Sequence, residues 1–286
     1  MPPLCKKDAY MNQIIGGISL LAVMLSSAAI LSIGWNSDVA PIPQDELESS
    51  IQEKVNPVVV ELFTSQGCNS CPPADDVLSE FANRKSILGA RIIPISFHVD
   101  YWDRLGWTDP FGDRRHSERQ RAYNERFEIN SFTPQMVVDG NVSLIGSQRQ
   151  RLMAAIDRER RRPKLTVELN ATGKPNGDLF VELNTPQPPE SRKHLEWVVV
   201  ITQDGLVQEI TSGENAGKTL HHDSVVRFYE RVPAFTDENN SRQTIEFSAS
   251  ALPQTGTDYN LVVMLQNTKE GNILGANSVP VKLNVP

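Results

Sequence analysis

The chain has 286 residues and a mass of 31.9 kDa, which is enough for two domains of ordinary size. It carries 28 lysines and arginines against 35 aspartates and glutamates, which gives a net charge of −7. This acidic balance disfavours a nucleic-acid partner held through its phosphates. The three cysteines are too few for a protein whose fold is held together by several disulfides. Two of them, Cys68 and Cys71, are separated by only two residues.

Residues 14–33 form an uncharged and mostly apolar run that is long enough to cross a bilayer as a helix. Lysines precede this run and acidic residues follow it, which predicts that the chain beyond it lies outside the cytoplasm. Two interpretations remain open for residues 1–35, a cleaved signal peptide or an uncleaved anchor that contacts the inner membrane. We therefore predict a periplasmic or secreted protein, with residues 36–56 as a linker.

Residues 57–163 show the alternation of strands and helices that is typical of an α/β domain. Short apolar runs rich in β-branched residues predict buried strands at residues 57–63 and 91–99. Asp139-Gly140 lies between two further short strands and predicts the turn of a β-hairpin. Apolar residues at helical spacing predict three helices, at residues 74–83, 113–127 and 148–160.

Residues 164–286 contain many short strands with turn signals and no clear helix, which predicts an antiparallel β-sandwich-like domain. The sequence Gly213-Glu214-Asn215-Ala216-Gly217 is similar to a phosphate-binding loop, but it has three residues between the glycines where that motif needs four. We interpret it as a turn. His221 and His222 are interpreted as exposed residues of a strand.

A Cys-x-x-Cys after the first strand and a proline entering the hairpin complete the outline of a thioredoxin-like domain. Further segments with a distinctive sequence are Glu61–Cys68, Ser96–Asp103, Gly106-Trp107, Asp109-Pro110-Phe111, Thr133-Pro134-Gln135 and Gly213–Gly217. In these segments the chain resembles the bacterial secreted family called "domain of unknown function 1223", a thioredoxin-like group. The resemblance covers about residues 57–280. Together with the patterns above, it predicts an α/β fold class, with a thioredoxin-like domain followed by an all-β antiparallel sandwich-like domain and an N-terminal apolar helix.

Two cysteines separated by two residues can close a small disulfide ring at the start of a helix. The helix N–H groups and dipole favour a thiolate there, so we predict Cys68 as the attacking sulfur. Cys71, one turn further into the helix, is predicted to attack the mixed disulfide and release the reduced partner.

The resemblance also implies roles for residues beyond the cysteines. Pro134 matches a cis-proline that lies beside the disulfide, and Thr133 precedes it in the segment that meets the bound chain. Glu61 corresponds to a buried acid that accepts a proton, although its offset from Cys68 differs by about one residue and a surface or structurally paired glutamate is the alternative.

An aromatic insertion follows the second strand and contains Tyr101, Trp102 and Trp107. Since it lies at the carboxyl end of a strand, we expect it at the same sheet edge as the cysteines. It is predicted to form either a substrate-facing wall or a packed cap.

The function predicted from these observations is an extracytoplasmic thiol–disulfide oxidoreductase that acts on protein thiols or disulfides and needs no organic cofactor. The alternative is a binding or copper-handling module. In that case Cys68 and Cys71 form a structural disulfide, or they hold copper(I) together with His98. In a third hypothesis, the β-sandwich-like domain carries the functional surface. The sequence predicts no oligomeric state.

Overall fold

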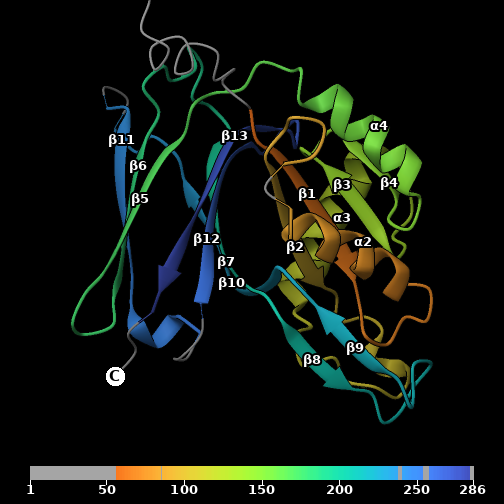
Figure 1. The fold of residues 1–286 in the computed structure, drawn as a ribbon. Helices are drawn as coiled ribbons and strands as arrows, with labels where there is room; N and C mark the ends of the chain where they lie inside the picture. The colour runs from red at the N-terminus through yellow and green to blue at the C-terminus, as the bar shows by residue number, and fades with distance from the viewer. Residues whose placement is uncertain (1–55, 85, 238–239, 254–257, 284–286) are drawn as a thin grey trace, which may run out of the picture. The chain divides into compact units, whose positions relative to one another are not determined.

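A computed structural model describes residues 56–84, 86–237, 240–253 and 258–283, all within one compact unit that spans residues 52–286 (Figure 1). The apolar helix predicted at residues 14–33 lies outside the described residues. Within the described ranges, no helix combines the length and the apolar character needed to cross a membrane.

An eight-stranded mixed sheet runs through the unit, in the order β13-β12-β7-β10-β2-β1-β3-β4. Strand β2 is parallel to both of its neighbours, β1 and β10, and every other pair in this sheet is antiparallel. The strands of this sheet are β1 (Val58–Thr64), β2 (Ile92–His98), β3 (Gln135–Val138), β4 (Val142–Ile145), β7 (Leu195–Gln203), β10 (Val225–Pro233), β12 (Asp258–Asn267) and β13 (Ile273–Lys282).

Three α-helices cover the β1–β4 half of this sheet, namely α2 (Pro72–Ala82), α3 (Arg114–Phe127) and α4 (Arg149–Glu159). Successive side chains of a strand point to opposite faces. Val60 and Leu62 of β1 pack with apolar residues of α2 and α4, whereas Val59 and Phe63 pack with Tyr123 of α3. Helix α3 therefore lies on one face of the sheet, and α2 and α4 lie on the other.

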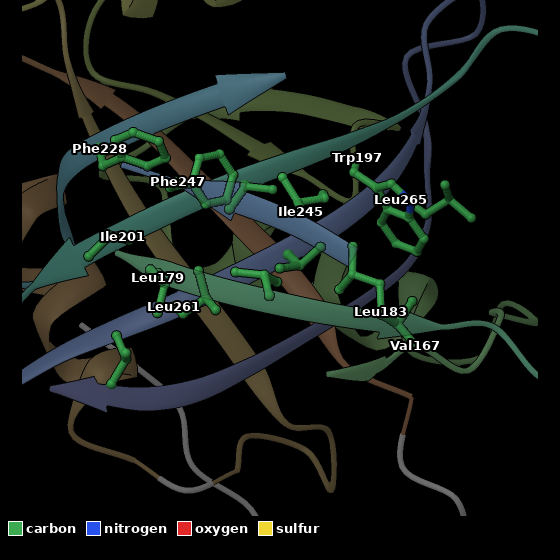
Figure 2. Packing of buried hydrophobic residues seen from close by; sticks show 14 of the residues in the cluster. Val167, Leu179, Leu183, Trp197, Ile201, Phe228, Ile245, Phe247, Leu261 and Leu265 are labelled. Atoms are coloured by element: carbon green, nitrogen blue, oxygen red, sulfur yellow. The ribbon is translucent and has the colours of Figure 1, made fainter. Parts of the chain in front are cut away.

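A second, three-stranded antiparallel sheet has the order β11-β6-β5, from β5 (Glu168–Gly173), β6 (Leu179–Asn184) and β11 (Arg242–Phe247). Its inner side chains pack against the β7 and β12 part of the large sheet, around the buried Trp197 (Figure 2). This is the largest of the apolar cores. It is built by aliphatic and aromatic residues that alternate along the strands of both layers, as face-to-face sheet packing requires.

The fold class predicted from the sequence, a thioredoxin-like domain followed by a separate β domain, is wrong. Strands from both halves of the chain join in one sheet, because β10 pairs in parallel with β2 through Val225 and Ser96. The Ser96 N–H also donates to the carbonyl of Ser224 at 2.7 Å. Local periodicity identifies strands but does not say which of them pair, so the shared sheet was not visible in the sequence.

The strands β8 (Leu206–Glu209) and β9 (Thr219–His222) form a two-stranded sheet of their own. Figure 1 shows this hairpin as a separate ribbon beside the helix α2. Its connecting loop approaches the turn that follows β1, where the two cysteines lie.

Candidate functional site

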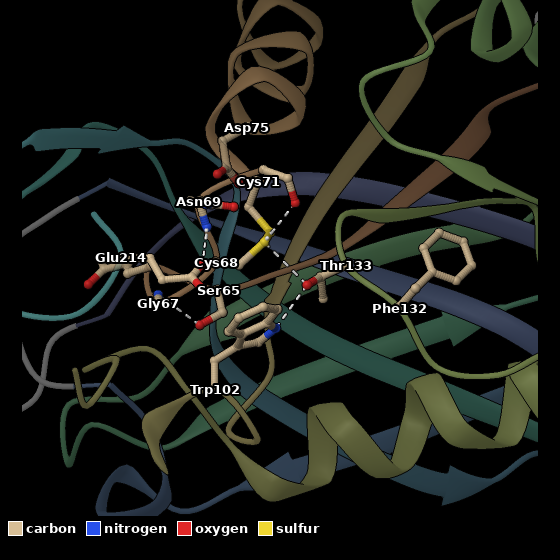
Figure 3. The surroundings of a disulfide bond; sticks show 12 residues. Ser65, Gly67, Cys68, Asn69, Cys71, Asp75, Trp102, Phe132, Thr133 and Glu214 are labelled. Atoms are coloured by element: carbon tan, nitrogen blue, oxygen red, sulfur yellow. Dashed lines mark hydrogen bonds between the residues drawn. A yellow bond between two sulfur atoms is a disulfide. The ribbon is translucent and has the colours of Figure 1, made fainter. Parts of the chain in front are cut away.

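Cys68 and Cys71 are joined by a disulfide in the turn between β1 and α2 (Figure 3). Cys71 is the N-cap residue of α2, and two prolines fill the first positions of the helix. Proline is tolerated there because its missing N–H has no partner inside the helix. Both cysteines are 0% exposed, although Asn69 and Ser70 between them are exposed. The disulfide therefore lies directly beneath a thin surface turn.

Hydrogen-bonding groups gather on the sulfur of Cys68. The Thr133 hydroxyl donates to this sulfur at 3.3 Å, and the Ser70 hydroxyl lies 3.4 Å from it. Trp102 Nε1 donates to the Thr133 hydroxyl at 2.9 Å, which fixes that oxygen in place. No such contact is found for the sulfur of Cys71 among the described residues. If the disulfide opens, these contacts and the start of α2 favour negative charge on Cys68.

The peptide bond between Thr133 and Pro134 is cis, and Pro134 is buried. The carbonyl of Pro134 accepts a hydrogen bond from the N–H of Gly146 at 2.9 Å. A Cβ atom on Gly146 would lie 2.8 Å from the Cβ of Ala74 and 3.3 Å from that of Pro134. The glycine thus lets the hairpin of β3 and β4 pack closely against the first turn of α2.

The aromatic insertion contacts the disulfide turn through two of its three predicted residues. A Cβ atom on Gly67 would lie 3.1 Å from the Cβ of Trp102, so that side chain covers the turn closely. Trp107 Nε1 donates to the Gln66 side chain at 3.0 Å. The Tyr101 hydroxyl donates to Gln120 of α3 at 3.2 Å. All three aromatic side chains are partly exposed.

The loop between β8 and β9 closes over the same turn, and we call residues 211–218 the clamp loop. Asn215 Nδ2 donates to the carbonyls of Gln66 and Cys68, at 2.8 and 3.0 Å. Glu214 Oε2 accepts from the N–H of Asn69 at 3.1 Å. Asn215 is 0% exposed. The clamp loop and the aromatic insertion thus both contact the disulfide turn.

A cluster of buried polar side chains lies behind the disulfide. Asp75 is on α2, one turn after Cys71, and its carboxylate lies 4.0 Å from the imidazole of His222 on β9. The rings of His222 and His98 are 4.9 Å apart, and His98 Nδ1 is 2.7 Å from the carboxylate of Asp109. Five of the eleven buried side-chain atoms without a hydrogen-bond partner in the described residues belong to Thr64, Asp75, His98 and His222.

Burial and charge set the protonation of this cluster. Burial raises the pKa of Asp75 to about 7, against an opposing effect of His98. Burial lowers the pKa of His222 to about 3, so its contact with Asp75 is not an ion pair near neutral pH. Burial also opposes the charged form of His98, but the charge and hydrogen bond of Asp109 outweigh it and raise the pKa of His98. Asp75 is thus poised to exchange a proton near pH 7.

Glu61 lies on the other face of the sheet from α2. Its two carboxylate oxygens accept hydrogen bonds from Arg119 Nε and from the Tyr123 hydroxyl, both at 2.6 Å. Both partners belong to α3, and the Glu61 carboxylate is fully buried. The structure therefore joins Glu61 to a buried ion pair and does not bring it together with the cysteines.

His98 ends β2, and its ring contacts the Asp109 carboxylate and the His222 ring. Across the described ranges, no three histidine, cysteine or acidic side chains are arranged so that they could hold a metal ion. Cys68, Cys71 and His98 thus do not form a ligand group in this oxidised state.

The sequence interpretation missed three residues around the disulfide. Asp75 gave no signal beyond a place in the first turn of a predicted helix. His222 was interpreted as an exposed strand residue, but only 2% of it is exposed. Asn215 was part of a motif interpreted as a simple turn, and the two glycines around it were the signal that this loop has a fixed shape.

The fold and the site define a mixed α/β protein with a buried disulfide at the start of a helix. The chain belongs to the family described as "Protein of unknown function (DUF1223)", whose sequence model matches residues 59–266. That span includes the disulfide, the clamp loop and the polar cluster.

Solved structures include a protein with the same overall arrangement. Protein AGR_C_4864 from Agrobacterium tumefaciens is similar over 78% of this chain and 93% of that chain, with 25% identity and a TM-score of 0.58. An endonuclease/exonuclease/phosphatase from Beutenbergia cavernae matches 40% of this chain and 23% of that chain, with 13% identity and a TM-score of 0.24, which is too low to carry an argument. No curated protein matches the chain.

Proposed function

We propose that this protein is a thiol–disulfide oxidoreductase that acts on protein thiols or disulfides through Cys68 and Cys71. The observation that carries the proposal is the asymmetry between the two sulfurs. The Cys68 sulfur has the Thr133 and Ser70 hydroxyls beside it, whereas none contacts the Cys71 sulfur in the described residues. A purely structural disulfide gains nothing from hydroxyl groups that would stabilise a thiolate. A disulfide that exchanges with a partner does gain from them, because a thiolate forms when it opens.

The proposed exchange begins when a partner thiolate attacks the sulfur of Cys68. The Cys68–Cys71 bond breaks, its electron pair goes to the sulfur of Cys71, and a mixed disulfide forms between Cys68 and the partner. A second thiolate of the partner then attacks this mixed disulfide and frees Cys68. The partner has lost two electrons and the protein has gained them as two thiols, with the two partner protons taken up overall. The reaction runs in either direction, as the two reduction potentials dictate.

A structural disulfide is the second candidate, and the burial of the sulfurs favours it. Both cysteines are 0% exposed, so a partner reaches Cys68 only if part of its cover moves. Bridges of this kind stabilise a loop and usually resist reduction by glutathione.

Trapping of a mixed disulfide separates the two candidates. In the Cys71→Ser variant the resolving sulfur is absent, so Cys68 should retain a disulfide-bonded partner after exposure to oxidised glutathione. We expect stoichiometric glutathione on Cys68 that a thiol reductant removes, with Cys68→Ser as the matched control. If Cys68 stays unmodified in the folded variant, the disulfide is structural.

The proposed location is the periplasm or the exterior of the cell, which rests on the apolar run at residues 14–33. An oxidising compartment also suits a chain that keeps a cysteine pair in the disulfide state. Protease protection of the intact chain in cells tests this location.

A further inference from the structure

The clamp loop contacts the disulfide turn through an unusual set of groups. It bonds to two backbone carbonyls, those of Gln66 and Cys68, and to one backbone N–H, that of Asn69. The Cys68 carbonyl also accepts from the N–H of Cys71 at 3.2 Å. All of the clamp-loop contacts come from the side chains of Glu214 and Asn215. Asn215 is the buried member, while the residues on either side of it are exposed.

The loop has a defined shape that aims the Asn215 amide. Lys218 Nζ donates to Asn215 Oδ1 at 2.8 Å, so both ends of the amide are used and its orientation is fixed. Gly213 and Gly217 have φ angles of +75° and +82°, a region that favours glycine. A Cβ atom on Gly213 would also lie 3.1 Å from the Cβ of Trp107. The conformation of the clamp loop therefore explains why glycines occupy positions 213 and 217.

The hairpin that carries the clamp loop is not paired with the eight-stranded sheet, because its two strands form a sheet of their own. It is held to the rest of the fold by side chains, among them the buried Leu220 and His222 of β9. An isolated two-stranded hairpin is marginally stable in water, so its place depends on side-chain contacts. It can therefore open locally without breaking the pairing of the large sheet.

The groups that the clamp loop satisfies are those that an extended polypeptide uses when it lies along another backbone. A carboxamide side chain is chemically a peptide group, and a carboxylate oxygen accepts as a peptide carbonyl does. We propose that the clamp loop occupies the place of the partner, and that the partner is an extended, cysteine-bearing polypeptide segment whose backbone displaces Asn215 and Glu214. This inference rests on the proposed function of the disulfide.

Displacement accounts for how a buried disulfide meets a partner. When the thiolate of the partner bonds to Cys68, backbone N–H groups of the partner take over from the Asn215 amide as hydrogen-bond donors to the carbonyls of Gln66 and Cys68. A backbone carbonyl of the partner replaces Glu214 on the N–H of Asn69. A small thiol such as mercaptoethanol has no peptide backbone and makes none of these hydrogen bonds. In its mixed disulfide with Cys68, the clamp loop therefore keeps its contacts with the disulfide turn.

Rates of disulfide opening in the full-length protein provide the first test. We compare wild type with Asn215→Ala and Glu214→Gln, using a reduced single-cysteine decapeptide and mercaptoethanol as probes. Asn215→Ala removes two hydrogen bonds and should speed opening by both thiols about tenfold or more. Glu214→Gln removes a carboxylate from beside the disulfide turn, where it accepts from the N–H of Asn69, and should give about a twofold increase. Glu209→Gln, an exposed acid on β8, is the matched control and should change neither rate.

Amide hydrogen exchange in Cys71→Ser provides the second test and does not depend on the folding of the Asn215 variant. Residues 211–218 should exchange about tenfold faster in the mixed disulfide with the peptide than in the one with mercaptoethanol. Equal protection of the clamp loop in the two adducts would overturn the inference while leaving the exchange function intact. If neither thiol opens the disulfide of wild type or of either clamp variant, the proposed function itself fails, and this inference fails with it.

Discussion

Replacing Asp75 with asparagine should remove a loss of stability that wild type suffers as the pH rises. Burial raises the pKa of this carboxyl from 3.8 to about 7. Between these values the folded protein holds a proton that the unfolded chain has released, so the free energy of unfolding falls with increasing pH. Each pKa unit corresponds to about 1.4 kcal/mol, so the full effect has a ceiling of about 4 kcal/mol. Asparagine does not ionise, so the variant escapes this loss.

The assay is urea unfolding of the oxidised full-length protein between about pH 5 and about pH 8. Over this range the stability of Asp75→Asn relative to wild type should rise by up to about 3 kcal/mol. His98, His222 and Asp109 also face Asp75. The charge of Asp75 helps to raise the pKa of His98, so the loss of that contribution is part of the measured difference. The matched control is Asp76→Asn, an exposed acid on the same helix.

Two outcomes decide the interpretation of Asp75. A widening gap between the Asp75→Asn and wild-type curves, with Asp76→Asn parallel to wild type, is the expected result. Parallel curves for all three proteins would refute the reasoning, because Asp75 would then keep the same charge over the whole range.

Three further substitutions test other contacts. Arg119→Met removes the cation that is hydrogen-bonded to the buried Glu61 carboxylate and should lower the free energy of unfolding by about 3–5 kcal/mol, measured by urea unfolding; a loss below about 1 kcal/mol would contradict a stabilising contact between Arg119 and Glu61. Gly140→Ala places a Cβ atom against the backbone carbonyl oxygen of Gly271 at a φ of +67°, and thermal unfolding should show a loss of about 2 kcal/mol or more, while an unchanged midpoint would contradict the close approach. Thr133→Val removes the hydroxyl that donates to Cys68 and should slow alkylation of the reduced protein near pH 7 about tenfold. An unchanged alkylation rate would mean that the hydroxyl does not stabilise the thiolate.

The local elements around the site were predictable from the sequence. The strand predicted at residues 57–63 is β1 (Val58–Thr64), and the helix predicted at residues 113–127 is α3 (Arg114–Phe127). The close position of the two cysteines and the cis isomer at Pro134 also agree with the structure. These features depend on short spacings, which periodicity and turn chemistry report well.

The long-range features were not predictable in the same way. The pairing of β10 with β2 joins segments more than a hundred residues apart, and no local pattern encodes it. For Glu61 the sequence left two roles open, a proton acceptor near the cysteines or a structurally paired glutamate. The alternation of side chains along β1 turns it toward Arg119 of α3, as in the second role. Asp75, His222 and Asn215 come from three different segments, so only the folded chain shows that they surround one disulfide.

The reduction potential of the Cys68–Cys71 disulfide tests the central claim most directly. The full-length protein is equilibrated in glutathione buffers of graded ratio, and its free thiols are counted after acid quenching. We predict a two-electron transition at a potential above about −300 mV, within the range of exchanging disulfides. A disulfide that stays closed through the most reducing buffer would contradict the claim and identify the bridge as a structural one.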